Sequence, residues 1–340
     1  MTQKKPARTK KKERNLAIIG GAGFLGTRLG DRLDKAGIDY TKYDINTVDS
    51  SSGIVYVNVE DKETLHQLTG TSSIINLAAV HRDDIRPVRR YDDVNVQGAK
   101  NTCDVARAYN INKIIFTSSV AIYGFAPPDT DETGEANYFN DYGRTKYMAE
   151  QVYKAWQAED SEKRTLVIVR PTVIFGEGNR GNVYNLLERI ASSRFVMIGN
   201  GKNKKSMAYV ENVAAFLEHC LSFGPGLHIY NYIDKPDLDM NTLVLKARNI
   251  LFGKKRIGLR LPAILGTAIG YIADFLAITL FKNMQISSIR IKKFMGNTQF
   301  NSSVNETGFN PPVQIEEGLD RTILYEFVED NSSKRIFETE

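Results

Sequence analysis

Short apolar runs alternate with longer amphipathic segments along the first half of the chain. The runs are rich in β-branched residues and predict strands at 15–19, 39–44, 54–58, 73–77, 113–118 and 166–170. The longer segments carry apolar residues at helical spacing and predict helices at 24–36, 91–109 and 141–159. Strands that alternate with helices in this way are typical of an α/β fold with a parallel sheet.

A glycine-rich loop follows the first predicted strand and opens the first predicted helix. It covers residues 20–26 and reads GGAGFLG. Glycines permit a tight turn and let the backbone approach a pyrophosphate, which then lies at the helix N-terminus. Asp44 ends the second predicted strand, where a carboxylate would bind ribose hydroxyls and repel a 2′-phosphate. The pattern predicts NAD rather than NADP; the alternative is that Asp44 is a simple turn residue.

The alternation ends after Gly176, where glycine, asparagine and longer loops become frequent. We therefore expect a Rossmann-type doubly wound parallel sheet, the NAD-binding domain, at 15–178, to which the chain returns at about 206–232. A smaller C-terminal α/β substrate lobe is expected at 179–330. Residues 1–14 are expected to form a basic, disordered tail.

Composition and cysteine content indicate a globular cytoplasmic protein. The chain has 42% hydrophobic and 25% charged residues. Its two cysteines, Cys103 and Cys220, lie in apolar helical contexts without metal-type spacing, which predicts neither a disulfide framework nor a metal site. The charged first fourteen residues do not resemble a signal peptide.

The net charge of +5 is distributed unevenly along the chain. Residues 1–14 carry seven Lys or Arg against Glu13 alone, and residues 240–305 carry ten against Asp274 alone. The rest of the chain is acidic. An acidic body with two basic regions favours an anionic surface as a partner. We expect no nucleic-acid partner, because no aromatic interleaving or known nucleic-acid module accompanies the basic residues.

Three residues form a candidate device for moving a proton: Ser119, Tyr142 and Lys146. Tyrosine is a poor base at neutral pH because its ordinary pKa is about 10. A lysine four residues later lies on the same helical face, so its ammonium can stabilise the phenolate. A serine from another element can hold the substrate oxygen. The alternative is an ordinary surface Tyr and Lys on a helix.

With these elements in order, the chain resembles the extended short-chain dehydrogenase/reductase family, and within it the nucleotide-sugar epimerases and dehydratases. The resemblance covers roughly residues 15–325. The motifs that carry it are GGAGFLG, NVED (58–61), NLAAVH (76–81), VNVQG (94–98), TSSVAIYG (117–124), YGRTK (142–146) and RPTVIFG (170–176).

The resemblance implies an NAD enzyme in which Tyr142 is the base, Lys146 tunes it and contacts the ribose, and Ser119 positions a sugar hydroxyl. Dehydratases of the family carry an Asp-Glu pair directly after that serine or threonine; Val120 and Ala121 stand there, which leaves epimerisation or ketone reduction. The cofactor contacts that the resemblance implies, besides Tyr142 and Lys146, are Gly20, Gly23, Phe24, Leu25, Gly26, Asp44, Asn58, Val59, Leu77, Ala78, Ala79, Asn95 and Pro171.

Longer stretches are similar to the bacterial 4-epimerases that act on N-acetylglucosaminyl-diphospho-undecaprenol and make the N-acetylgalactosaminyl lipid of some O-antigens. These stretches include RPTVIFGEGNRGNVYNLL, KSMAYVENV and YNYIDKPDLDMN. The alternatives are a 4-epimerase of UDP-N-acetylglucosamine or UDP-glucose, an NAD(P)H-dependent 4-ketosugar reductase, and an NAD-sensing regulator without turnover. The family resemblance also implies a homodimer through 91–109 and 141–159.

Three further residues bear on the sugar and its diphosphate. Asn182 would, by the resemblance, face the diphosphate, although it could instead cap a helix. Lys205 replaces an arginine that many relatives use on the diphosphate. Thr298 aligns with a bulky tyrosine of the epimerases restricted to plain hexoses, and its smaller side chain would leave room for an N-acetyl group. Ser119 and Val120 complete the expected substrate contacts.

A mainly apolar run at 262–281 lies inside the basic-flanked segment 254–293. Lys254, Lys255, Arg256 and Arg260 precede it, and Lys282, Arg290, Lys292 and Lys293 follow it. Thr267, Tyr271 and Asp274 fall on one helical face, which favours an amphipathic helix at an anionic membrane interface over a simple span. The alternative is a buried helix of the substrate lobe. We therefore expect a peripheral protein at the cytoplasmic face of the bacterial inner membrane.

Overall fold

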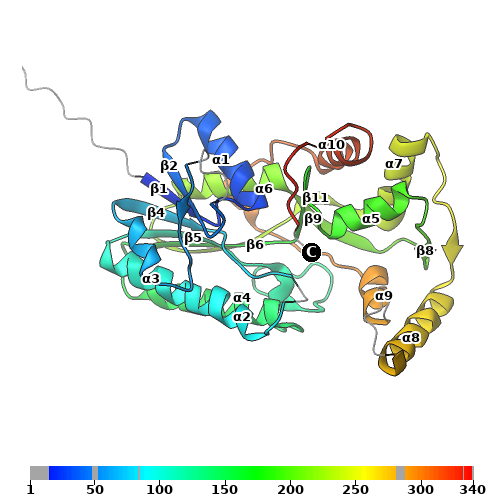
Figure 1. Cartoon of the computed structure of the whole chain (residues 1–340), viewed down its shortest axis with the longest axis horizontal. Coiled ribbons are helices and arrows are strands. Elements are labelled where there is room, and N and C mark those ends of the chain that lie inside the picture. Colours follow the sequence, from blue (N-terminus) through cyan, green and yellow to red (C-terminus); the bar gives the residue numbers. More distant parts are fainter. Residues whose placement is uncertain (1–14, 48–52, 83–84, 281–287, 332, 339–340) are drawn as a thin grey trace, which may run out of the picture.

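A seven-stranded parallel sheet forms one half of the molecule (Figure 1), a computed structural model that describes residues 15–47, 53–82, 85–280, 288–331 and 333–338. The strand order is β10-β6-β5-β4-β1-β2-β3. The central strands are buried on both faces, as their continuous apolar sequence requires. The strands are β1 (Asn15–Ile19), β2 (Tyr40–Asp44), β3 (Val55–Tyr56), β4 (Thr71–Asn76), β5 (Lys113–Thr117), β6 (Thr165–Pro171) and β10 (Gly226–Tyr232).

Helices cover both faces of this sheet (Figure 1). α1 (Phe24–Ala36) and α6 (Val210–His219) pack together on one face, and α3 (Gly98–Ala108) and α4 (Asp141–Ala158) pack together on the other. The predicted helix at 91–109 is divided, because α2 (Arg89–Tyr91) and a π-helical turn (Asp92–Gln97) precede α3. Shorter 3₁₀ helices lie at Thr64–Leu68, Val120–Tyr123, Cys220–Ser222 and Val304–Thr307.

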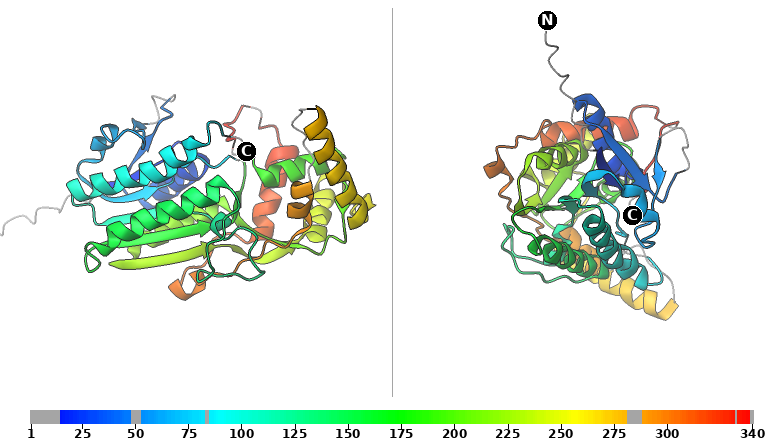
Figure 2. Two further views of the ribbon diagram at one scale, coloured as in Figure 1. Left: turned by 90° about the horizontal axis from the view of Figure 1, so that it is seen from below. Right: turned by 90° about the vertical axis from the view of Figure 1, so that its left-hand side faces the viewer.

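The second half is smaller and lies at the carboxyl ends of the central strands (Figure 2). It contains a three-stranded sheet in the order β11-β9-β7 and a two-stranded sheet of β12 and β8. Its strands are β7 (Val173–Phe175), β8 (Met197–Ile198), β9 (Lys204–Tyr209), β11 (Asp234–Asp239) and β12 (Arg260–Leu261). Its helices are α5 (Asn182–Ala191), α7 (Met240–Phe252), α8 (Ala263–Leu280), α9 (Ser288–Met295) and α10 (Ile315–Phe327).

The chain crosses between the halves more than once. After β7 and α5 it passes through β9 into α6 and then β10, which pairs with β6 along its whole length in the parallel sheet. A separate apolar core of α5, α7, β9 and α10 side chains, among them Leu187, Tyr209, Leu243 and Leu319, stabilises the smaller half. The cleft between the halves therefore has walls that come from distant parts of the sequence.

Some sequence expectations fall outside the described part of the chain. The basic tail at 1–14 and Lys282 are not described, nor are the side chains of Asp274, Arg290 and Lys293. Among the helices that the structure does describe, none combines the length and the apolar character needed to cross a bilayer.

Candidate active site

The glycine-rich loop joins β1 to α1 at the carboxyl edge of the parallel sheet. Gly20 has a positive φ of 81°, and a Cβ there would lie 2.8 Å from the backbone nitrogen of Ala78. A Cβ on Gly26 would lie 2.5 Å from the carbonyl oxygen of Gly20. Only glycine fits at these two positions, so the loop can bring its backbone close to a ligand.

The N-terminus of α1 is open to an anion. Its N-cap residue, Gly23, supplies no side-chain hydrogen bond, and the first turn contains no acidic residue. Asp44 at the end of β2 accepts a 2.9 Å hydrogen bond from the backbone N–H of Ala22. This bond ties the glycine loop to the strand that carries the expected ribose-binding carboxylate.

Lys146 lies in the first half of α4 and is almost completely buried, with 2% of its surface exposed. Its Nζ donates a 2.7 Å hydrogen bond to the carbonyl oxygen of Thr117 at the end of β5. Burial lowers the pKa of Lys146 to about 7, and the negative charge of Glu150 opposes that shift. A nearby anion would strongly stabilise the charged form of a lysine buried in this way. Tyr142, whose phenolate would be such an anion, lies one turn earlier on the same helix.

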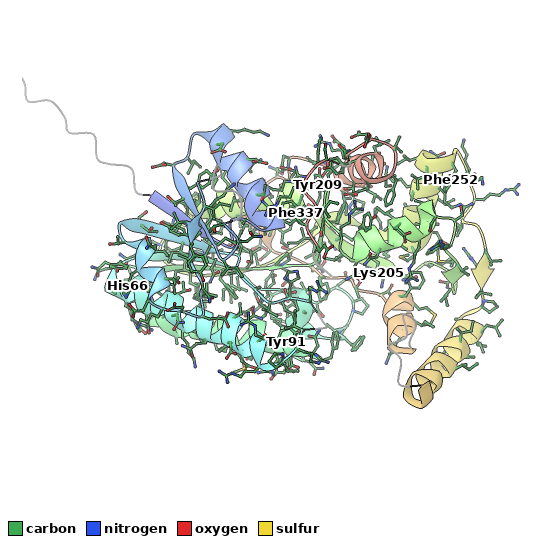
Figure 3. The ribbon with its side chains drawn as sticks, in the orientation of Figure 1. His66, Tyr91, Lys205, Tyr209, Phe252 and Phe337 are labelled. Atoms are coloured by element: carbon green, nitrogen blue, oxygen red, sulfur yellow. The ribbon has the colours of Figure 1, made fainter. Side chains whose placement is uncertain are left out.

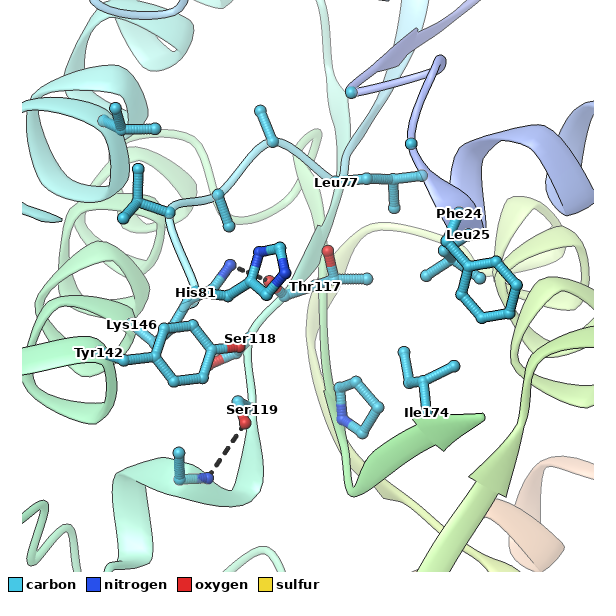
Figure 4. A pocket seen from close by; sticks show the side chains of 18 of the residues that line it. Phe24, Leu25, Leu77, His81, Thr117, Ser118, Ser119, Tyr142, Lys146 and Ile174 are labelled. Carbon is cyan, nitrogen blue, oxygen red and sulfur yellow. Dashed lines mark hydrogen bonds between the residues drawn. The ribbon is translucent and has the colours of Figure 1, made fainter. Parts of the chain in front are cut away.

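Two consecutive serines follow β5 and reach the same place. Ser119 has an extended backbone, and its Oγ accepts a 3.1 Å hydrogen bond from the N–H of Ala121. Ser118 is 2% exposed, and its Oγ has no hydrogen-bond partner within the described structure. Figure 4 shows Tyr142, Lys146 and both serines gathered on one side of a pocket, opposite Phe24, Leu25 and Ile174.

This pocket, of about 650 Å³, brings together nearly all the residues singled out in the sequence. On the cofactor side it is lined by Gly20, Gly23, Phe24, Leu25, Gly26, Asp44, Asn58, Val59, Leu77, Ala78, Ala79 and Pro171. At the reacting centre it is lined by Ser119, Val120, Tyr142 and Lys146, and farther out by Asn182 and Thr298.

The structure does not bring two of the predicted residues into this pocket. Asn95 is buried beside it: its amide nitrogen donates to Val80 O and Thr145 Oγ1, and its amide oxygen accepts from Val80 N–H. These bonds hold the loop after β4, so Asn95 supports the wall of the pocket. Lys205 Nζ donates a 2.7 Å hydrogen bond to the carbonyl oxygen of Gly296. Side chains alternate in direction along a strand, and the neighbouring Ser206 is the β9 residue that lines the pocket.

Other lining residues were not singled out in the sequence. They include His81, Thr117, Ser118, Ser206 and Phe300. His81 and Ser118 belong to motifs quoted above, NLAAVH and TSSVAIYG, so their place in a motif was the available signal. No sequence signal pointed to Phe300, because it comes from a segment far along the chain. Its backbone is held near the pocket by a β-bridge to Thr130.

No grouping of three or more His, Cys, Asp or Glu side chains in the described structure could hold a metal ion. Among the described residues, the carboxylates that line the pocket are those of Asp44 and Glu60, both on the cofactor side, and Glu60 pairs with Arg90 at 2.8 Å. At the positions after Ser119, Val120 and Ala121 line the pocket without an acidic group. Acid-assisted loss of water therefore has no proton donor of that kind beside Ser119.

Comparison with known proteins agrees with the glycine loop and the pocket in indicating a protein that binds NAD. Residues 16–232 match the model of the NAD dependent epimerase/dehydratase family. The chain belongs to this family. It is accordingly an NAD-dependent enzyme, and the predicted resemblance and cofactor are confirmed.

One curated relative matches almost end to end. The N-acetyl-alpha-D-glucosaminyl-diphospho-ditrans,octacis-undecaprenol 4-epimerase of Escherichia coli O157:H7 is 44% identical over 323 residues, covering 92% of this chain and 96% of that protein. The UDP-glucose 4-epimerase of Vibrio cholerae is 23% identical over 330 residues, covering 92% of this chain and 95% of that protein. Of these two relatives, the undecaprenol-linked sugar 4-epimerase is much the more similar to this family member.

Solved structures confirm the predicted fold class. The UDP-glucose 4-epimerase of Thermotoga maritima with UDP-glucose superposes with a TM-score of 0.70 at 20% identity, covering 92% of this chain and 98% of that one. MoeE5 in complex with UDP-glucuronic acid and NAD gives a TM-score of 0.72 at 18% identity, with the same coverage. The family member thus has the complete fold of these enzymes.

The residues present fit NAD. The glycine loop leaves a cradle that a Cβ would fill, the N-terminus of α1 is free of side-chain caps, and the buried Ser118 hydroxyl lacks a partner. The glycine loop and the first turn of α1 would hold the diphosphate, while Asp44 would hold the adenosine ribose.

Proposed function

We propose that this protein is a 4-epimerase that interconverts N-acetylglucosaminyl- and N-acetylgalactosaminyl-diphospho-undecaprenol through a 4-keto sugar. The observation that carries the proposal is the 44% identity to an enzyme with this activity over 96% of that enzyme's length. The pocket supports it, because Ser119, Tyr142 and Lys146 all line one wall. Such an enzyme would serve the biosynthesis of O-antigen or other surface polysaccharide.

In this proposal Tyr142 acts as the general base. Its phenolate takes the proton of the C4 hydroxyl, and Ser119 Oγ holds the same sugar oxygen by a hydrogen bond. Lys146 stabilises the phenolate, because an ammonium buried beside it favours the charged form. When the 4-keto sugar is reduced, Tyr142 returns the proton to the oxygen at C4.

NAD, which the glycine loop and Asp44 would hold, would supply the hydride acceptor for C4 and the hydride donor for the 4-keto sugar. The chain's part in inversion is to let the sugar turn while its oxygen stays within reach of Tyr142 and Ser119. The Val120 and Ala121 side chains favour this outcome over dehydration, because they place no acid beside the sugar. Asn182 and Thr298 line the outer pocket, where the diphosphate and the N-acetyl group would lie.

The deciding experiment compares two substrates on the purified enzyme. We expect faster conversion of N-acetylglucosaminyl-diphospho-undecaprenol than of UDP-N-acetylglucosamine at equal concentration. Separation of the two epimeric sugars measures the amount converted. Faster turnover of the UDP-sugar would overturn the lipid-linked assignment in favour of a nucleotide-sugar 4-epimerase.

The same assay separates the remaining alternatives. A 4-ketosugar reductase would consume NADH in proportion to product, whereas an epimerase needs no added reductant. An NAD-sensing regulator would convert none of these sugars while still binding NAD. The proposed epimerase predicts turnover with no net change of NAD.

We also propose that the protein attaches peripherally to the cytoplasmic face of the bacterial inner membrane, through α8 and the chain that leads into it. Gly266 and Gly270 are the buried residues of the described part of α8, and a Cβ on Gly266 would lie 2.3 Å from Ile198 Cγ2. The helix therefore meets the body of the protein through glycines rather than through its large apolar side chains. The exposed apolar side chains are Leu259, Ile264, Leu265, Ile269 and Ile272, which we call the α8 apolar face.

This arrangement differs from one of the two sequence expectations, while the amphipathic interface helix stays a prediction. A buried helix is contradicted, because Ile264 is 82% exposed and Ile272 is 59% exposed. Tyr271, expected on the polar side with Thr267, is also exposed. A contiguous apolar face of this kind on a protein surface marks a site for a partner or a lipid.

Charge favours an anionic lipid surface as the partner of the α8 apolar face. Lys254, Lys255 and Arg256 are exposed just before β12, and Lys292 on α9 is exposed beside Phe125, 5.5 Å from its ring centre. Apolar residues flanked by basic ones are typical of segments that lie in an anionic membrane interface. α9 packs against α8 and ends three residues before Thr298, which lines the outer pocket.

Vesicle sedimentation tests the membrane proposal. We expect the protein to bind phosphatidylglycerol vesicles more tightly than phosphatidylcholine vesicles, and Ile264→Ser with Ile269→Ser to weaken that binding. Leu227→Ser is the matched control, because Leu227 is 45% exposed but lies on β10 in the other half. Equal binding by all variants, or no binding by the wild type, would overturn the proposal.

The homodimer through α3 and α4 stays a prediction from the family resemblance. Sedimentation equilibrium of the wild type and of a charged variant of the exposed Met148 on α4, Met148→Glu, would test it. We expect a dimer that the variant weakens; a monomeric wild type would contradict the prediction.

A further inference from the structure

The C-terminal residues 333–338 return to the cleft between the two halves after α10 has ended. Figure 1 shows the chain that follows α10 running between the parallel sheet and the smaller half, and Figure 3 shows Phe337 beside α1. This segment pairs with the loop that follows β7. Phe337 N–H donates to Gly178 O, and Arg180 N–H donates to Phe337 O, both at 2.8 Å.

The same segment also contacts the glycine-rich loop. Arg335 Nη2 donates a 2.9 Å hydrogen bond to the carbonyl oxygen of Ala22. The ring of Phe337 packs against Phe24 with 5.6 Å between ring centres, and the Arg335 guanidinium lies 4.8 Å from the Phe337 ring. Arg335 and Phe337 therefore connect two loops that are otherwise far apart in the chain.

Both of these loops line the pocket. Gly23 and Phe24 do so from the glycine-rich loop, while Asn179 and Gly181 do so from the loop after β7, next to Asn182 at the start of α5. Neither Arg335 nor Phe337 is a lining residue. Each would act by holding a loop in place, which makes them positioning residues. For a dinucleotide to leave through the opening between these loops, the loops must separate.

We propose that residues 333–338 form a clamp that slows the release of NAD by holding the glycine-rich loop against the loop after β7. The proposal rests on the proposed function, because an epimerase needs one cofactor molecule for both halves of its reaction. If NADH left at the ketone stage, a 4-keto sugar would remain and the next turnover would require fresh NAD. A clamp that opens rarely prevents this loss without touching the reacting atoms.

Truncation gives the first test. The enzyme without residues 333–340 is purified with its NAD, and released NAD is reduced by excess alcohol dehydrogenase with ethanol as hydride donor and read as NADH absorbance. We expect release about tenfold faster than from the full chain, since at least one charge-assisted hydrogen bond and an aromatic contact are lost. An unchanged release rate would overturn the clamp.

Point variants keep the proposal testable if the truncated chain folds poorly. Arg335→Gln removes the charge-assisted bond to Ala22, and Phe337→Ala removes the contact with Phe24. Ile336→Ala is the matched control, because Ile336 lies between them in sequence and is 49% exposed. We expect faster NAD release from the first two only, with thermal unfolding measured alongside. Equal release from all three variants would overturn the specific contacts.

A second measurement separates the clamp from a general loss of structure. During turnover, the two clamp variants should release more 4-keto sugar and NADH per product than the control, at nearly unchanged kcat. If the wild type epimerises sugars but the truncated enzyme releases NAD no faster than the wild type, the clamp proposal is wrong and the proposed function stands. Wild-type protein that binds NAD but epimerises nothing would defeat the proposed function, and the release assay would still decide the clamp.

Discussion

Helices α4 and α8 have the same length, 18 residues, and opposite relations to the core. α4 buries Lys146 and Glu150, whereas α8 exposes Ile264, Ile269 and other apolar side chains. An ordinary surface helix does the reverse, with apolar residues inside and charged residues outside. The comparison shows that each helix departs from the usual pattern at the residues to which we assign a function.

In α4 the buried charges are compensated by neighbours. Glu150 forms two hydrogen bonds to Arg170 on β6, at 2.9 and 2.7 Å, and Arg170 also donates to Tyr123 Oη at 2.6 Å. Lys146 has the Thr117 carbonyl oxygen, without an opposite charge in direct contact. The bonds between Glu150 and Arg170 anchor α4 to the sheet. Lys146 instead presents an ammonium that an anionic partner can stabilise.

In α8 the exposed apolar side chains have no such compensation within the described structure. The buried glycines at 266 and 270, of which Gly266 lies against Ile198, leave the large residues turned outward. A protein that gains stability from burying such residues would not arrange them this way. Under the membrane proposal, the α8 apolar face serves binding rather than folding, and the two helices should respond differently to mutation.

The largest expected effect is at α4. Tyr142→Phe removes the proposed base and should lower kcat by about 100- to 10,000-fold, the usual contribution of general acid–base catalysis. The amount of NAD bound per protein should remain nearly unchanged. Tyr147→Phe, on the same helix, is the control and should keep its turnover. Near-normal turnover of Tyr142→Phe would exclude the assigned role.

The next effect is on stability. Glu150→Gln leaves the Arg170 guanidinium buried at 4% exposure without an opposite charge and should lower the free energy of unfolding by about 3–5 kcal/mol. Glu159→Gln, which breaks surface ion pairs with Arg107 and Arg164, is the control and should have little effect. Urea denaturation measures both. Equal losses would show that burial does not distinguish these pairs.

Stability should also depend on pH through Lys146. Burial lowers its pKa from 10.5 to about 7, so between these values the unfolded chain binds more protons than the folded one. The free energy of unfolding therefore rises with pH across this window, by up to about 1.4 kcal/mol per pH unit from this residue. Lys146→Met should remove that part of the slope.

The pH experiment needs a difference measurement. Burial also lowers the pKa of Lys205, to about 8, which adds a slope of the same sign. Urea unfolding of wild type and Lys146→Met across the neutral to alkaline range isolates the Lys146 contribution. Parallel curves for the two proteins would show that Lys146 keeps its proton in the folded state throughout.

The smallest effect on stability is expected at α8. Ile264→Ser and Ile269→Ser should change the free energy of unfolding by no more than about 0.5 kcal/mol, as substitutions at exposed sites do. Ile190→Ser on α5 is the control, because Ile190 is fully buried, and it should cost several times more. A large loss at Ile264 would mean that this side chain is covered in solution.

Most of the parallel sheet could be predicted because its central strands contain short apolar, β-branched runs. Strands β1, β2, β4, β5 and β6 lie within about two residues of the predicted runs. The run at 54–58 shortens to Val55–Tyr56, an edge strand that pairs with β2 alone. The smaller half was not predictable in this way, because its strands have two to six residues and show no clear period.

The site was predictable where it depends on local spacing. The glycine loop, Asp44 and the Tyr142–Lys146 pair all line the pocket, since strand ends at the carboxyl edge of a parallel sheet converge. Asn95 and Lys205 do not line the pocket, because side-chain direction there follows hydrogen bonds and register, and their predicted contacts stay predictions. The side-chain amide of Asn95 is hydrogen-bonded to Val80 and Thr145, and on β9 it is Ser206 that lines the pocket.

By itself the sequence determined the parallel sheet, the NAD loop and the common face of Tyr142 and Lys146, because periodicity and spacing within one segment are enough for these. Only the tertiary structure decided which face of α8 meets the body, and that Arg335 reaches Ala22 across 313 positions of sequence. Such contacts depend on how separate elements pack, and no local pattern encodes the partner of a side chain that comes from another part of the chain.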